Sequence, residues 1–115
     1  MRIFLVLVSL FLIGCSPVWE EQPYEVYYID GTKRIGHIVG EGAYIGRIDE
    51  PINIETNEKY ISVYACPYEA CAFYYIDKIK DHKFAEHDEF VYGPYTKDQF
   101  SALVKKLGLP VVSSV

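Results

Sequence analysis

The side chains of this chain that are best suited to chemistry are its cysteines and a short segment of histidines and carboxylates. Cys66 and Cys71 are separated by four residues, and Cys15 stands alone near the start of the chain. Two cysteines at this spacing can form a disulfide, hold a metal ion or act as a redox pair. A redox pair usually has two residues between its cysteines and a helix that begins beside them. Neither feature is visible in the sequence, so redox chemistry is the least favoured of the three.

Histidine and carboxylate side chains gather in one polar segment, which contains Asp81, His82, Glu86, His87, Asp88 and Glu89. These are ligand types that zinc accepts, but the two histidines lie in an expected loop and no H-E-x-x-H helix is present. We therefore expect a solvated loop and no metal site. The remaining histidine, His37, falls inside an expected strand, where a packed side chain is favoured over a general base.

Motifs of the common enzyme classes are missing from the sequence. There is no G-x-S-x-G nucleophile motif, no P-loop and no G-x-G-x-x-G. Gly36, Gly40, Gly42 and Gly46 fall in expected strands and turns, which indicates bends and bulges and not a phosphate cradle. We therefore expect that the chain is not an enzyme and has no catalytic residue and no cofactor. A small enzyme is the alternative.

Residues 1–15 have a pattern of their own. Arg2 precedes an apolar run over residues 3–13 that only Ser9 interrupts. The run is shorter than the roughly 20 residues that a membrane-spanning helix needs, and it has the length of a signal-peptide core. The residues that close it, Leu12-Ile13-Gly14-Cys15, resemble the lipobox of bacterial lipoproteins.

The lipobox resemblance implies that Cys15 receives a diacylglyceryl group on its sulfur, that signal peptidase II cuts after Gly14, and that the new amine is acylated. Residues 1–14 are then a signal peptide, and residues 15–23 are a lipidated cysteine with a tether. Two or more acyl chains anchor a protein stably. Ser16 is similar to the outer-membrane sorting pattern, so we expect a periplasm-facing chain at the outer membrane in preference to the inner one. An ordinary signal peptide and an uncleaved anchor helix are the alternatives.

The same resemblance bears on the other two cysteines. The domain of a lipoprotein lies outside the cytoplasm, where disulfides persist. With Cys15 used for lipid, Cys66 and Cys71 have one possible pairing. The resemblance thus implies a structural disulfide between them, with a metal pair as the main alternative.

The charge of the mature chain limits its partners. Of the 11 Lys and Arg and the 16 Asp and Glu, only Arg2 lies in residues 1–14, which leaves a net charge of −6. This balance disfavours nucleic acid, whose phosphates require a basic surface, and it disfavours attachment to anionic lipid through a polybasic segment. A basic or neutral partner fits better.

Tyrosine is the outlier in the composition, with 11 residues. Its ring suits half-buried strand faces and also binding surfaces. Tyr68 lies between Cys66 and Cys71, at the expected tip of their loop, and Tyr44 falls in another expected strand. We single out Tyr68 and Tyr44 as candidate partner-binding residues.

Alternating and β-branched residues predict a single small α+β domain over residues 24–115. The expected strands are 24–29, 33–39, 43–48, a short edge strand near 52–54, 60–65, 72–77 and 90–92. Thr96 and Gln99 form a capping box, and the apolar residues that follow recur at helical spacing up to Gly108. The predicted architecture is a mostly antiparallel sheet of hairpins with one C-terminal amphipathic helix packed on it.

Residues 90–112 resemble half of a SPOR domain. A strand that Gly93 and Pro94 are expected to end, an aromatic residue, the capped helix and a short edge strand at Val111 and Val112 follow in the order of that family. SPOR domains bind the glycan strands of peptidoglycan, so the resemblance implies peptidoglycan as an alternative partner.

Together these features predict a membrane-anchored envelope lipoprotein that acts as a non-enzymatic protein-interaction module of the inhibitor, accessory or exclusion type. Its partners are the membrane, through Cys15, and an unidentified envelope protein. A peptidoglycan-binding or glycan-binding lipoprotein is the first alternative, and a small periplasmic enzyme is the second.

Overall fold

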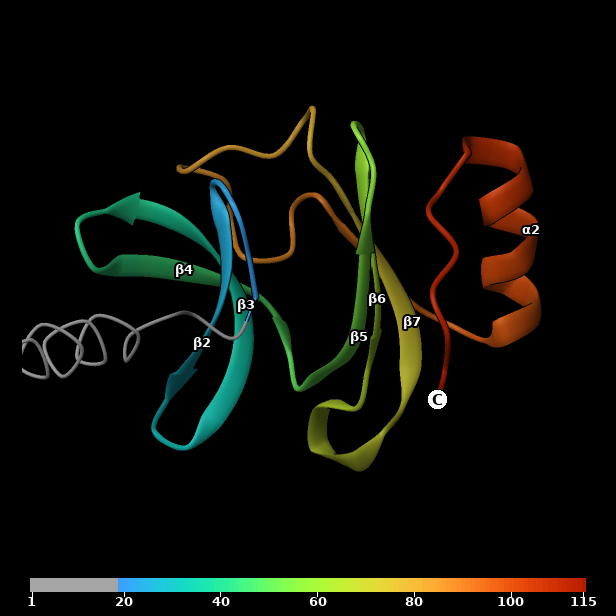
Figure 1. Ribbon diagram of the computed structural model, residues 1–115, viewed down its shortest axis with the longest axis horizontal. Helices are drawn as coiled ribbons and strands as arrows, with labels where there is room; N and C mark the ends of the chain where they lie inside the picture. The colour runs from blue at the N-terminus through green and yellow to red at the C-terminus, as the bar shows by residue number, and fades with distance from the viewer. Residues whose placement is uncertain (1–18) are drawn as a thin grey trace, which may run out of the picture.

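A computed structural model describes residues 19–115 and arranges them in three layers (Figure 1). Sheet A forms one outer layer, sheet B lies in the middle, and helix α2 (Lys97–Leu107) covers the far side of sheet B. Sheet A contains β1 (Trp19–Glu21), β2 (Tyr24–Ile29), β3 (Thr32–Gly40) and β4 (Ala43–Asp49), and sheet B contains β5 (Pro51–Thr56), β6 (Tyr60–Ala65), β7 (Ala72–Asp77) and β8 (Val91–Tyr95).

Each strand pairs antiparallel with the strand that precedes or follows it in the sequence. The α+β class and the C-terminal helix are thus confirmed, but the strands form two sheets where the sequence suggested one. The chain passes from one sheet to the other at Glu50. The Glu50 N–H donates to the Lys33 carbonyl in sheet A at 2.8 Å, and its carbonyl accepts from the Cys66 N–H beside sheet B at 3.0 Å.

The main core fills the space between the two sheets. Its buried members are Tyr24, Val26, Ile35, Ile48, Ile61, Val63, Ala65 and Ile76. Successive side chains of a strand point to opposite faces, so Ile61, Val63 and Ala65 of β6 reach this core while Tyr60 and Tyr64 pack on the helix side. Two sheets form because each has an apolar face that has to be buried, and the two faces bury one another.

Strand β1 lies in the segment predicted to be a tether. Trp19 pairs with Val26 and Glu21 pairs with Tyr24, and the Trp19 ring packs against the main core. The segment predicted to be a tether thus contains a strand from Trp19 onward. A ladder with β2 and the partly buried Trp19 hold this strand, although its sequence has no period.

Helix α2 begins and ends as the sequence predicts. The Thr96 side chain accepts from the Gln99 N–H, the Gln99 side chain accepts from the Thr96 N–H, and Gly108 ends the helix in the left-handed conformation. Phe100 is buried and stacks on Phe73 of sheet B, with ring centroids 5.1 Å apart. The apolar stripe of the helix therefore builds a second core on the outer face of sheet B.

The edges of sheet B differ from the prediction at two places. Strand β8 runs through Gly93 and Pro94, which were expected to end it. Because β8 is an edge strand, a proline without an N–H is tolerated there. The predicted strand at Val111 and Val112 is wrong: both residues lie outside any strand, and Val112 is instead buried against the second core.

Candidate interaction surface around the disulfide loop

The predicted disulfide between Cys66 and Cys71 is present in the structure and closes the end of the β6–β7 hairpin. The last pair of the ladder is Ala65 with Ala72, directly beside the bond. Two backbone hydrogen bonds add to the closure, from the Glu69 N–H to the Cys66 carbonyl at 3.2 Å and from the Ala70 N–H to the Pro67 carbonyl at 3.0 Å. The loop is therefore fixed both covalently and by hydrogen bonds.

Tyr68 lies at the tip of this loop, in the short turn η2 (Pro67–Glu69), with 94% of its surface exposed. Its φ is 52°, and φ of Glu69 is 68°. A bulky residue at positive φ is uncommon. Each such residue costs on the order of 1–3 kcal/mol and persists only where its surroundings enforce it. The closed loop enforces a strained backbone that directs an aromatic side chain into solvent.

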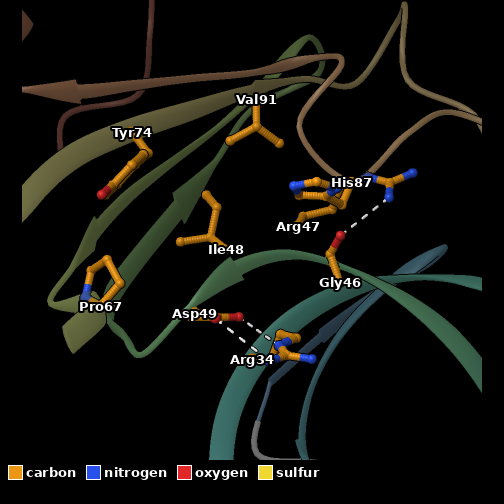
Figure 2. A pocket seen from close by; sticks show the side chains of 9 residues that line it. All are labelled: Arg34, Gly46, Arg47, Ile48, Asp49, Pro67, Tyr74, His87 and Val91. Atoms are coloured by element: carbon orange, nitrogen blue, oxygen red, sulfur yellow. Dashed lines mark hydrogen bonds and ion pairs between the residues drawn. The ribbon is translucent and has the colours of Figure 1, made fainter.

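Two hollows flank the tip, and Figure 2 shows the larger one. It has a volume of about 380 Å³ and is lined by Arg34, Gly46, Arg47, Ile48, Asp49, Pro67, Tyr74, His87 and Val91. The second has about 360 Å³ and is lined by Thr32, Arg34, Asp49, Glu50, Cys66, Tyr68 and Glu69. Residues of the disulfide loop line both hollows, and Arg34 and Asp49 belong to both. We call Tyr68 with these two hollows the tip surface.

The Arg34–Asp49 ion pair is the polar centre of the tip surface. The Arg34 Nε lies 2.5 Å from one carboxylate oxygen of Asp49, and Nη2 lies 3.5 Å from the other. The hydrogen bond to Asp49 raises the pKa of Arg34. The side chains are 30% and 33% exposed, so a partner can reach them. Gly46 makes room for this arrangement, since a Cβ there would lie 2.6 Å from the Arg34 Cδ.

The structure does not bring Tyr44 to the tip surface. Tyr44 is half buried on the outer face of sheet A and stacks on Tyr27, with ring centroids 4.5 Å apart and planes 19° apart. Gly36 lies under the Tyr27 ring, because a Cβ would approach the Tyr27 Cε1 to 2.5 Å. Tyr44 therefore lines neither hollow of the tip surface.

The histidine and carboxylate segment is a loop, as predicted, but one of its carboxylates has a structural partner that sequence reasoning missed. Asp81 is buried and accepts hydrogen bonds from Arg47 Nε at 2.9 Å, Arg47 Nη2 at 3.0 Å and the Tyr24 hydroxyl at 2.9 Å. Burial, followed by the charge of Asp81, raises the pKa of Tyr24. Nothing in the sequence links Arg47 to a residue 34 positions away.

The other residues of that segment remain near solvent, and His87 lies 3.7 Å from Asp88 with both side chains more than two-thirds exposed. Within residues 19–115, no three His, Cys, Asp or Glu side chains come close enough together to hold a metal ion. His37 is a packed strand histidine: its ring meets the Tyr24 ring edge-on at 5.1 Å, and its Nδ1 lies 2.8 Å from the Ile38 carbonyl.

The predicted lipidation site, Cys15, and the predicted signal peptide, residues 1–14, lie outside the described residues. In the described part of the chain, no helix is both long and apolar enough to cross a membrane. No protein-family model, no curated protein and no solved structure matches the chain.

Proposed function

We propose that this chain is a membrane-anchored, non-enzymatic protein-interaction module that engages an envelope protein through the tip surface. The observation that carries the proposal is a tyrosine that is 94% exposed on a loop closed by a disulfide. Tyrosine is enriched among the residues that contribute most to protein interfaces. A loop already held in its bound shape loses little conformational freedom on binding, which favours affinity.

The surroundings of Tyr68 suit a protein partner better than a small molecule. Each hollow is open to solvent and mixes apolar walls with the half-exposed Arg34–Asp49 pair. A partner side chain placed in the larger hollow meets an apolar wall formed by Ile48 and Tyr74 beside a charged rim. Anchor residues that fill such pockets, with polar groups around them, are typical of protein interfaces.

The anchoring part of the proposal rests on the lipobox resemblance of residues 12–15. Lipid on Cys15 would hold the domain at the periplasmic side of a membrane, with the outer membrane favoured by Ser16. The intact mass of the product isolated from cells tests this part: loss of residues 1–14 together with the mass of acyl chains supports it, and an intact N-terminus contradicts it.

The binding part is tested by site-specific photo-crosslinking in cells that express the full chain. A crosslinking amino acid at position 68 should trap one discrete partner, and the same amino acid at position 28 should not. Tyr28 is the matched control, because it is a tyrosine that is 62% exposed on sheet A. Tyr68→Ala should weaken partner recovery about 30-fold, the effect of losing a typical hot-spot residue, whereas Tyr28→Ala should not. Equal recovery with both variants removes the tip from the interface.

A glycan-binding lipoprotein is the second candidate. The observation in its favour is the Tyr27–Tyr44 stack on the half-exposed outer face of sheet A, since an aromatic face that remains open can pack on a sugar ring. Sedimentation with purified peptidoglycan separates the two proposals: enrichment in the pellet that Tyr44→Ala abolishes supports glycan binding, and no enrichment dismisses it.

A further inference from the structure

Two large apolar side chains stand exposed on the loop that joins β7 to β8. Ile79 is 71% exposed and Phe84 is 81% exposed. Lysines lie beside both of them in the sequence, at positions 78, 80 and 83, and the Lys83 Nζ lies 5.1 Å from the centre of the Phe84 ring. Single exposed apolar side chains are common on protein surfaces, but here each of the two stands beside a lysine in the sequence.

The exposure of these side chains is imposed by the fold and is not the result of a loose loop. Asp81, two residues after Ile79, is held in the interior by Arg47 and Tyr24. Ala85, directly after Phe84, is 2% exposed and accordingly packed. Phe84 lies between Asp81 and Ala85 in the sequence, and Ile79 lies two residues before Asp81. Because Asp81 and Ala85 are held in the interior, Ile79 and Phe84 remain on the surface.

The position of the loop indicates what covers it. The Lys78 Nζ lies 3.5 Å from a carboxylate oxygen of Glu21, so the loop begins beside β1, the first strand that the structure describes. Because β1 is paired with β2, the reach is counted from Trp19. Three residues separate Trp19 from Cys15, and four extended chain steps span at most about 14 Å. A membrane that holds Cys15 is therefore within reach of this loop.

We propose that Ile79 and Phe84 insert into the headgroup region of the anionic lipid bilayer to which the chain is anchored. This inference rests on the anchoring part of the proposed function. Phenylalanine and other large apolar residues with lysines at their side bind membrane surfaces by combining apolar burial with attraction to anionic lipid. Lys80 and Lys83 supply the cations. Of the acidic residues of the loop, Asp81 is paired with Arg47, and Glu86, Asp88 and Glu89 follow in its returning part.

The acidic balance of the whole chain is compatible with this contact because the contact is local and partly apolar. A net charge of −6 over residues 15–115 disfavours attachment by charge alone. Insertion of Ile79 and Phe84 places only the nearest side chains within a Debye length of the headgroups, about 8 Å at physiological salt. Those nearest cations are the lysines that flank the two apolar residues.

This contact also fixes how the tip surface is presented. Strand β7 runs from the disulfide loop at one end of sheet B to the Ile79–Phe84 loop at the other, and Figure 1 shows the two loops at opposite ends of the sheet. With Phe84 at the membrane, Tyr68 points away from the bilayer. The partner is then an envelope protein that approaches from the aqueous side.

The experiment uses the full chain in vesicles of 70% phosphatidylethanolamine and 30% phosphatidylglycerol, with bromine on the acyl chains as a fluorescence quencher. Phe84→Trp and Tyr68→Trp each add one tryptophan to a chain whose only other tryptophan is Trp19. Both sites are strongly exposed, so neither change disturbs a core. The unmodified chain gives the Trp19 signal to subtract.

We expect the added fluorescence of Phe84→Trp to fall at least twofold in brominated vesicles and to shift to the blue, and that of Tyr68→Trp to stay unchanged. Replacing the anionic lipid by phosphatidylcholine should weaken the quenching of Phe84→Trp. If the chain floats with the vesicles but Phe84→Trp is not quenched, the docking proposal is wrong and the anchor stands. If the chain does not float with the vesicles, both are wrong. Equal quenching of the two variants overturns the proposed orientation.

Discussion

The buried ion pair between Arg47 and Asp81 gives the sharpest prediction about stability. Arg47→Met keeps most of the side-chain volume but removes both guanidinium hydrogen bonds to Asp81, at 2.9 and 3.0 Å. Asp81, whose side chain is 0% exposed, then keeps only the Tyr24 hydroxyl and the His82 N–H as donors. A carboxylate is left without a counter-ion in the interior.

Breaking a buried pair in this way costs about 3–5 kcal/mol, a large part of the roughly 5–15 kcal/mol by which a domain is stable. Arg34→Met is the matched control on the same sheet, because it makes the same chemical change in the Arg34–Asp49 pair. That pair is 30% and 33% exposed, so its loss should cost about 0–1 kcal/mol.

Urea denaturation at pH 7, followed by far-ultraviolet circular dichroism with the disulfide intact, measures both variants. We expect the unfolding midpoint of Arg47→Met to fall several times further than that of Arg34→Met at an unchanged slope. A double variant, Arg47→Met with Asp81→Leu, should recover part of the loss because no charge remains unpaired. Equal decreases in the unfolding midpoint of the two single variants would refute the argument that burial determines how much an ion pair contributes to stability.

Three further predictions concern stability. Burial raises the pKa of Tyr75 to about 12. The neutral phenol therefore makes its full contribution to folding stability below about pH 10, and this contribution is lost as the pH rises toward 12. Over this pH range, the urea unfolding midpoint should fall less steeply in Tyr75→Phe than in the unmodified chain. Replacing Cys66 and Cys71 by serine opens a short loop and should lower the unfolding free energy by about 2 kcal/mol, measured by urea titration, and no change would mean that the loop is already closed in the unfolded chain. Both Gly93 and Gly108 have positive φ, but Gly93→Ala should lower the melting temperature more than Gly108→Ala. A Cβ at position 93 would lie 2.6 Å from the Tyr74 ring, whereas a Cβ at position 108 would have no surrounding atom within 4 Å. Similar decreases in melting temperature for the two variants would contradict this reasoning.

Local signals predicted the elements of the fold well. The Asp30–Gly31 turn has positive φ at both residues, as a tight hairpin requires. The capping box at Thr96 and the left-handed Gly108 delimit the helix. These features depend on residues a few positions apart, so the order of the chain is enough to reveal them.

Features that depend on distant contacts were not predicted. Trp19 joins a strand because Val26 and the main core lie beside it, and Val112 is buried by the helix side of sheet B without pairing as a strand. At the tip, the sequence indicated Tyr68 and the disulfide, but not the hollows, because Arg34, Asp49 and Tyr74 come from three different strands.

By itself, the sequence determined every strand of the described residues except β1, the capped helix and the one close cysteine pair, because turn chemistry, side-chain alternation and ring closure act over short stretches of chain. Only the tertiary structure decided that the strands divide into two sheets, that Asp81 is buried against Arg47, and that Tyr68 and Phe84 lie at opposite ends of sheet B. The physical reason is that the burial of a residue depends on the residues that surround it in space. Arg34 and Arg47 are the same residue type in neighbouring strands, but packing leaves Arg34 partly exposed to solvent and buries Arg47 in the core.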